Sequence, residues 1–300
     1  MMAIETTDLG RRFKRSDGLR KASLRVPEGS ALALIGANGA GKTTLLRILV
    51  NVLRPTAGSA RVLGKDSRTL TAADFNRIGY VAENQKLPER LSVEQFLAYL
   101  SRLYTRWDGR LAQRLLRDFE LPPGRPIGKL SHGMRMKVML TGAVAFRPEL
   151  LLLDEPLTGL DPLTRDEVVA GLVRQADETT IVISSHEMAE VEGLATEIAY
   201  LDRGFLEFQQ PTQDLLARFR HVTVTLNQPP PSLDDLPGNL LLVQGFERTI
   251  TFIEPRFAGE ASLRKKISAY YGSIEHFTAE RMSLRDVSKA LLQASRVLHP

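Results

Sequence analysis

Short apolar runs alternate with amphipathic stretches along the first two thirds of the chain. Residues 31–35 and 150–153 are apolar at every position, which predicts strands buried on both faces. Residues 42–53 and 92–119 instead space their apolar side chains as helices do. Because strands alternate with helices, the pattern indicates an α/β fold with a largely parallel sheet and helical crossovers.

Further elements follow from the same periodicity. Strands are expected at residues 3–7, 24–26, 59–63, 78–82, 180–184, 198–201 and 205–209, and helices at 131–145, 163–176 and 187–194. The helical block at about 88–147 lies between two core strands, which predicts a separate lobe. The segment around residues 11–21 is basic and is expected to form a turn region.

The last third of the chain has a different character. A polar, proline-rich loop at 228–236 is expected to be stiff and to follow a domain boundary. Beyond it, strands are expected at 240–243, 249–253 and 274–278, and helices at 263–271 and 284–294. The sequence therefore predicts a first domain at residues 1–219 and a small α+β domain at residues 220–300.

Composition narrows the choice of function only slightly. The absence of cysteine excludes disulfides, thiolate catalysis and cysteine metal sites. No run reaches the ~18 apolar residues of a membrane helix, and a secretory signal is not expected from the residues at the start of this sequence. The net charge of +5 fits a surface near anionic lipid, nucleotide or nucleic acid without selecting one of them.

A phosphate-binding loop follows the first apolar run. Residues 36–43 read GANGAGKT, which fits the pattern G-x-x-x-x-G-K-[ST] with a strand before it and a helix after it. Glycines let the backbone turn its N–H groups toward an anion. Lys42 is expected to reach the β- and γ-phosphates and Thr43 to bind Mg²⁺. The predicted nucleotide-binding residues of this loop are Gly36, Asn38, Gly39, Ala40, Gly41, Lys42, Thr43 and Thr44.

Two carboxylates end the second apolar run. Asp154 and Glu155 follow residues 150–153, so Asp154 is placed beside the phosphate loop, where it can hold Mg²⁺. Glu155 is expected to point elsewhere, because side chains alternate along a strand. It is the candidate to polarise an attacking water.

The segment KLSHGMR at residues 129–135 resembles the signature sequence of ABC ATPases. Ser131 can cap the following helix, and Gly133 allows close approach to a phosphate. The resemblance implies a P-loop NTPase core with an antiparallel β subdomain and an inserted helical lobe, beside the small α+β appendix. It also implies that Ser131 and Gly133 meet the γ-phosphate held by a second subunit.

Other motifs are similar to those of the same family. The resemblance implies a cross-dimer role for Asp161 in LTGLD, a γ-phosphate contact for His186 in SSHE, and adenine stacking for Phe13. Departures occur at His132 and Met134 of the signature, and at Glu83, which stands where the family has a glutamine that senses Mg²⁺ and the γ-phosphate. Gln85 lies two residues further on, so either residue could take that role.

The resemblance implies an ATPase subunit that uses ATP and Mg²⁺. It would form a homodimer or heterodimer with a second ATPase subunit and power a separate membrane permease from the cytoplasmic face. Catalysis would rest on Glu155, His186 and Lys42, and the metal on Thr43, Asp154 and Glu83. The tail MSLRDV at 282–287 and the stretch YTRWD at 104–108 resemble ATPases of ABC-2-type exporters.

Three alternatives differ in class. The first is a soluble ABC ATPase acting on nucleic acid or ribosome-associated machinery, through the basic residues Arg11, Arg12, Lys14, Arg15, Arg20 and Lys21, although a solvated basic face is the more common use of such a run. A GTPase is disfavoured because no Asn-Lys-x-Asp is present. A non-hydrolysing regulatory subunit is disfavoured by Glu155.

Overall fold

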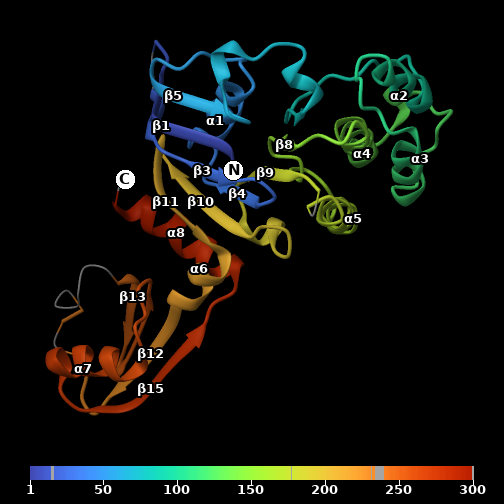
Figure 1. The fold of residues 1–300 in the computed structure, drawn as a ribbon. Coiled ribbons are helices and arrows are strands. Elements are labelled where there is room, and N and C mark those ends of the chain that lie inside the picture. The colour runs from blue at the N-terminus through green and yellow to red at the C-terminus, as the bar shows by residue number, and fades with distance from the viewer. Residues whose placement is uncertain (15–16, 177, 231, 234–239, 299–300) are drawn as a thin grey trace. The chain divides into compact units, whose positions relative to one another are not determined.

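A computed structural model describes residues 1–14, 17–176, 178–230, 232–233 and 240–298 (Figure 1). The chain divides into two compact units, Met1–Gln209 and Gln210–Pro300. The division falls inside strand β11 (Phe205–Pro211), whereas the sequence pattern suggests a boundary after Phe219.

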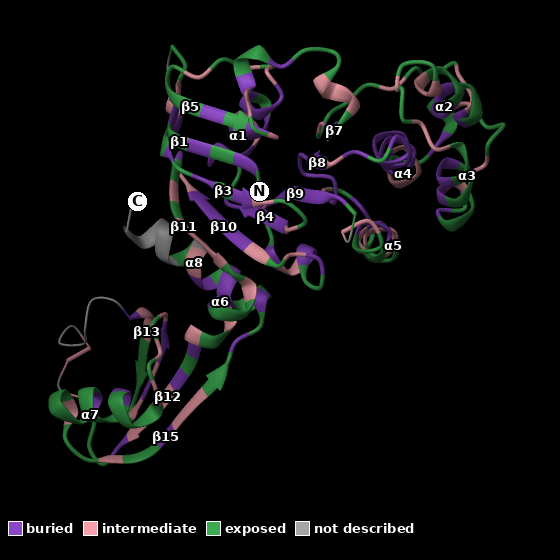
Figure 2. Ribbon diagram, in the orientation of Figure 1, coloured by how far each residue is buried: buried purple, intermediate pink, exposed green. Residues whose placement is uncertain are grey.

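The core of the first unit is a six-stranded sheet in the order β11-β10-β4-β9-β8-β7. Strands β10, β4, β9, β8 and β7 run parallel to one another. Every residue of β4, β8 and β9 is buried, as Figure 2 shows in purple. This explains the continuous apolar runs and confirms the predicted parallel sheet. The other strands of this sheet are β4 (Ala31–Ile35), β7 (Ile78–Val81), β8 (Leu150–Leu153), β9 (Thr180–Ser185) and β10 (Glu197–Asp202).

A second sheet in the same unit is antiparallel. Strand β1 pairs with β2, β3 and β5, which gives the antiparallel subdomain that the family resemblance implies. The prediction of a turn at the basic segment was wrong in part, because residues 17–22 form strand β2. Only Leu19 and Ala22 are buried there, so the apolar signal is too sparse to show a strand. The strands are β1 (Met2–Arg12), β2 (Asp17–Ala22), β3 (Arg25–Pro27), β5 (Ala57–Val62) and β6 (Lys65–Asp66).

Helices cover the sheets and form the insertion between β7 and β8 (Figure 1). Helix α4 is buried over most of its length, which Figure 2 also shows. The predicted segment 187–194 contains only a 3₁₀ turn. The α-helices of the first unit are α1 (Lys42–Leu49), α2 (Val93–Ser101), α3 (Gly109–Asp118), α4 (His132–Val144) and α5 (Pro162–Val173). The 3₁₀ turns are η1 (Ser67–Thr69), η2 (Asp74–Asn76), η3 (Ile127–Lys129) and η4 (Met188–Val191).

The second unit contains a four-stranded antiparallel sheet in the order β13-β14-β12-β15. Leu263 and Ile267 of α7 pack into its apolar cluster. The inner strand β12 was missed, although RHVTVTL alternates as a half-buried strand should. Part of the predicted loop, including Pro231, Asp234 and Asp235, lies outside the described residues. The elements are α6 (Thr212–Arg218), β12 (Arg220–Leu226), β13 (Leu241–Phe246), β14 (Thr249–Glu254), α7 (Glu260–Tyr271), β15 (Ile274–Arg281) and α8 (Leu284–Leu298).

Within the described ranges, no helix combines the length and the apolar character that crossing a membrane requires.

Candidate nucleotide site

The phosphate loop joins β4 to α1 by a turn that needs glycine. Gly39 and Gly41 have φ angles of 84° and 109°, where a side chain causes strain. A Cβ at Gly41 would also lie 2.4 Å from the carbonyl oxygen of Gly18. Helix α1 begins at Lys42 without a side-chain cap, so its first N–H groups remain available to an anion.

The side chain of Lys42 folds back over the phosphate loop. Its Nζ donates to the carbonyl oxygen of Gly36 at 2.6 Å and lies 3.0 Å from Oε1 of Glu155. Only 5% of the Lys42 side chain is exposed, and 7% of that of Glu155. A buried ammonium is therefore balanced by a buried carboxylate at the position where the loop would receive a phosphate.

Asp154 lies at the carboxyl end of β8, beside α1. The Thr43 hydroxyl donates to its Oδ1 at 2.9 Å, and the Ser184 hydroxyl donates to the same atom at 3.1 Å. Oδ2 is buried and has no hydrogen-bond partner in the described chain. Burial raises the pKa of the Asp154 carboxyl, against the Thr43 and Ser184 hydrogen bonds. An unpartnered carboxylate oxygen beside a threonine hydroxyl suits a hard cation such as Mg²⁺.

Glu155 does not point away from the loop, so that prediction was wrong. Its φ of 51° lies in the left-handed region, which departs from the alternation of an extended strand. Both carboxylates consequently face the phosphate loop, Asp154 toward Thr43 and Glu155 toward Lys42. Burial raises the pKa of Glu155, but Lys42, His186 and Thr158 together lower it below its usual value.

Two further side chains hold the Glu155 carboxylate. His186, just after β9, donates from Nδ1 to Oε2 at 3.1 Å, and the Thr158 hydroxyl donates to the same oxygen at 2.9 Å. The Ser184 hydroxyl also accepts from the Glu155 amide. Thr158 and Ser184 were not among the predicted site residues. Both lie inside the motifs LTGLD and SSHE, but the family resemblance assigned roles there only to Asp161 and His186.

A cleft of about 640 Å³ opens over these groups. It includes Phe13 and Glu83, which are remote from the loop in sequence. It also includes Asp17 and Gly18, which the sequence did not suggest. The phenyl ring of Phe13 covers Gly18, since a Cβ there would lie 2.4 Å from the ring. The lining residues are Phe13, Asp17, Gly18, Asn38, Gly39, Gly41, Lys42, Thr43, Thr44, Glu83 and Glu155.

The signature segment, residues 129–135, lies outside the nucleotide cleft. None of the described residues that line the cleft comes from residues 129–135. Ser131 is exposed and caps α4, its Oγ accepting from the Met134 amide at 3.2 Å, which confirms the predicted cap. A Cβ at Gly133 would lie 2.7 Å from the Thr164 side chain. Asp161 caps α5, and the Thr164 amide lowers the pKa of its carboxyl.

Comparison with known proteins decides the family. The family description "ABC transporter" matches residues 19–158. The bacitracin transport ATP-binding protein BcrA of Enterococcus faecalis is 30% identical over 224 residues, 73% of each chain. This chain belongs to the ABC transporter ATP-binding proteins. It is also 30% identical to the uncharacterized ABC transporter ATP-binding protein YhaQ of Bacillus subtilis over 290 residues, 92% of each chain.

A solved structure agrees with this ABC fold. The ATP-binding subunit of an ABC transporter is 26% identical, with a TM-score of 0.65 over 72% of this chain and 92% of that one. The chain is an ATP-binding subunit and an ATPase. Its phosphate loop and carboxylates therefore lie in an ABC ATPase core with an antiparallel subdomain and an inserted helical lobe.

The segment between β7 and α2 contains both sensor candidates, Glu83 and Gln85, and they lie in different surroundings. Glu83 lines the nucleotide cleft, whereas Oε1 of Gln85 accepts from the Ala82 amide at 3.3 Å. Both line a second cleft of about 420 Å³ against α4. The residues of this second cleft are Glu83, Asn84, Gln85, Lys86, Leu87, Glu89, Ile127, His132, Arg135 and Met139.

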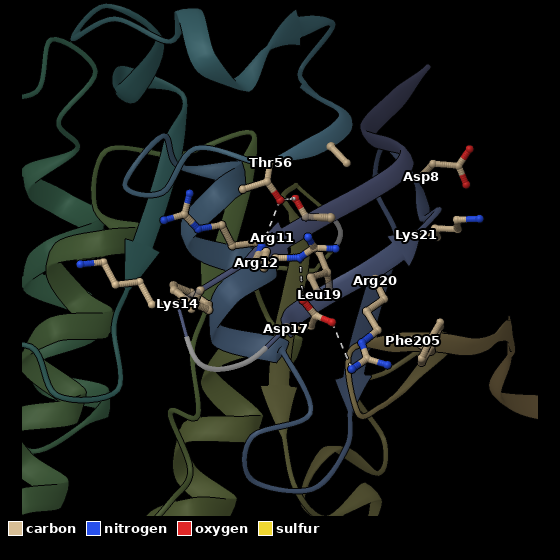
Figure 3. Close-up of a pocket in the computed structure, with 13 residues that line it drawn as sticks. Asp8, Arg11, Arg12, Lys14, Asp17, Leu19, Arg20, Lys21, Thr56 and Phe205 are labelled. Atoms are coloured by element: carbon tan, nitrogen blue, oxygen red, sulfur yellow. Dashed lines mark hydrogen bonds and ion pairs between the residues drawn. The ribbon is translucent and has the colours of Figure 1, made fainter.

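A basic pocket of about 780 Å³ lies on the antiparallel sheet beside Phe13 (Figure 3). Arg12 and Arg20 each lie 3.2 Å from a carboxylate oxygen of Asp17, and the Arg11 guanidinium lies 5.0 Å from the Phe13 ring centroid. Three cations of the basic run are therefore engaged within the chain. Arg15 lies outside the described residues. The lining residues are Asp8, Gly10, Arg11, Arg12, Phe13, Lys14, Asp17, Leu19, Arg20, Lys21, Thr56, Ala57 and Phe205.

Proposed function

We propose that this subunit binds Mg·ATP in the 640 Å³ cleft, closes on a second ATPase subunit, and powers a separate membrane permease. One observation carries the proposal. Lys42, Thr43, Asp154 and Glu155 form one network at the phosphate loop, while the signature segment lies outside the cleft that this network lines. A single chain thus supplies two halves of an ATP site, the phosphate-loop network and the signature segment, that do not face each other.

The residues divide the work by their chemistry. Lys42 and the loop amides stabilise charge on the transferring phosphoryl group. Glu155 polarises the attacking water as a general base, a task for which its buried carboxylate is ionised. His186 orients that carboxylate through its 3.1 Å hydrogen bond. Phe13 would stack on adenine, and Ser131, Gly133 and Asp161 would serve the ATP of the second subunit.

Thr43 and Asp154 would hold Mg²⁺, with Glu83 facing the same cleft. The metal supplies charge neutralisation on the phosphate oxygens. The buried, unpartnered Oδ2 of Asp154 supports this assignment, because an ionised oxygen without a partner is costly to bury. Between the two sensor candidates, the cleft favours Glu83 over Gln85.

The permease partner is supported by the second cleft and by one relative. The 420 Å³ cleft between the Glu83 segment and α4 is the candidate docking surface. The BcrA relative is named for bacitracin transport. Together with the exporter-like tail at 282–287, this favours an ABC-2-type export system, with the subunit at the cytoplasmic face of the membrane. The appended unit 210–300 is an accessory domain in this proposal.

Two measurements test the proposal. Glu155→Gln with Mg·ATP is expected to run as a dimer in size-exclusion chromatography with light scattering, and as a monomer without nucleotide. A permanently monomeric variant would contradict the two-subunit site.

The permease is tested by cross-linking, which the absence of native cysteine makes clean. Lys86→Cys lies in the second cleft and is expected to cross-link in native membranes to a polytopic membrane protein. Lys65→Cys, on the antiparallel sheet, is the matched control. Equal cross-linking of the two variants would argue against docking at this cleft.

A further inference from the structure

His132 makes a contact that its place in the signature does not explain. It is the first residue of α4 and is exposed. Its Nε2 lies 3.2 Å from the carbonyl oxygen of Thr158, a residue of the turn that follows β8. Since a carbonyl oxygen can only accept, Nε2 must carry the proton.

The turn that His132 contacts also carries a side chain that is hydrogen-bonded to the carboxylate of Glu155. The Thr158 carbonyl oxygen accepts a hydrogen bond from His132, and the Thr158 hydroxyl donates to Oε2 of Glu155 at 2.9 Å. Gly159 follows with a φ of 73°, and a Cβ built there would make an ordinary van der Waals contact with the His132 ring, 3.7 Å from Nε2. The signature helix and Glu155 are therefore two hydrogen bonds apart within one chain.

The outer end of this link faces the second cleft. His132 lines that cleft together with Arg135 and Met139 of α4 and with residues between β7 and α2. A molecule that fills the cleft would contact the ring that holds the Thr158 turn. The connection is a contiguous chain of contacts, which is a physical basis for coupling but requires a direct energetic test.

We propose that His132 is a positioning residue for Glu155, acting through Thr158 and accessible from the docking cleft. The proposal rests on the function proposed above, because it assigns Glu155 as the general base. It predicts that removing the imidazole loosens the Thr158 turn and misplaces the carboxylate. Because neither His132 nor Thr158 lines the nucleotide cleft, the loss should fall on kcat rather than on KM.

The first test is a double-mutant cycle on steady-state ATPase activity. His132→Ala and Thr158→Val are each expected to lower kcat about 5-fold, the scale of one net hydrogen bond, with KM within about 2-fold. If the residues act in series, the double variant falls by about 5-fold rather than by the roughly 25-fold of independent effects. Independent multiplication of the two losses would overturn the proposal.

A conservative variant separates positioning from general damage to the helix. His132→Gln keeps an N–H donor at similar reach and is expected to restore kcat, whereas alanine does not. Arg110→Ala, at an exposed site of α3, controls for unspecific effects on the helical lobe. Failure of glutamine to recover more activity than alanine would count against the hydrogen bond.

Amide hydrogen exchange gives a readout that needs no turnover. The Thr158 and Leu160 amides donate to Glu155 and Leu157 within the turn, so they should exchange faster in His132→Ala and at the original rate in His132→Gln. If the unmodified chain hydrolysed ATP no faster than Glu155→Gln, the proposed function would fail, and the exchange rates alone would then decide the role of His132. Unchanged exchange in His132→Ala would overturn that role.

Discussion

The phosphate loop and the signature segment both offer backbone N–H groups at the start of a helix, yet the chain completes only one of them. Helix α1 begins without a side-chain cap and has Lys42, Asp154 and Glu155 around it. Helix α4 is capped by the exposed Ser131, and the nucleotide cleft excludes its start. The difference teaches that similar local structure serves different partners when the tertiary environment supplies charge to one site and leaves the other exposed.

The largest effect should come from the catalytic carboxylate. Glu155→Gln is expected to slow ATP hydrolysis by roughly 10³-fold, because a general base contributes 10²–10⁴-fold. ATP binding should persist, since the amide no longer competes with phosphate for Lys42. Steady-state ATPase assays and nucleotide titration measure both. Glu149→Gln, at a partly exposed ion pair, should behave like the unmodified chain; turnover of Glu155→Gln at the normal rate would refute its assignment.

A smaller effect, on binding, is expected at Lys42. Lys42→Ala removes the buried ammonium of the loop and should weaken ATP binding by roughly 100-fold, given 1.5–3 kcal/mol for each hydrogen bond to a charged group. Lys65→Ala, which loses only the partly exposed pair with Asp74, is the matched control. Calorimetric titration distinguishes them, and undiminished affinity of Lys42→Ala would invalidate the phosphate-loop assignment.

The comparison between the two helix starts is tested most directly at their caps. Ser131→Ala is expected to cost about 1 kcal/mol of stability and to lower ATPase activity roughly 10-fold through the lost contact to the second subunit's ATP. Ser92→Ala removes an equivalent cap, that of α2, and should cost stability alone. ATPase rates at matched temperature decide; equal activity of the two variants would make Ser131 a cap only.

The smallest effect concerns pH and Asp154. Its folded pKa is raised by burial, so its contribution favours the folded state at low pH and is lost as pH rises through that pKa. Asp154→Asn should therefore raise Tm by about 2 °C in magnesium-free buffer at neutral pH. The gain should shrink as the solution is acidified. Thermal unfolding across pH measures this, and a gain that grew on acidification would contradict the sign of the pKa shift.

Much of the fold could be predicted because the burial of strands and helices sets the spacing of apolar residues along the sequence. The runs 31–35 and 150–153 have no polar position since both faces of β4 and β8 are covered. Strand β2 escaped because its charged residues face outward and only Leu19 and Ala22 are buried. Strand β12 was not predicted, although its sequence RHVTVTL alternates in burial as a half-buried strand does.

For the site, the sequence by itself determined which chemical groups are present. Glycines at 39 and 41, Lys42, Thr43 and the pair 154–155 stand close together in short motifs, so their residue types and spacing suffice to predict an ATP site. The resemblance to ABC ATPases rests on the signature-like segment 129–135, and the comparison with known proteins shows membership of that family. These features are local, and local geometry is encoded by neighbouring residues.

Only the tertiary structure decided how the groups are oriented and connected. The positive φ of Glu155 turns it toward Lys42, against the alternation that a strand predicts. His186 and Thr158 meet on one carboxylate oxygen, and His132 reaches the same turn from another helix. These contacts join segments as far apart in the sequence as Lys42 and Glu155. Their geometry depends on the packing of whole elements, which no short motif records.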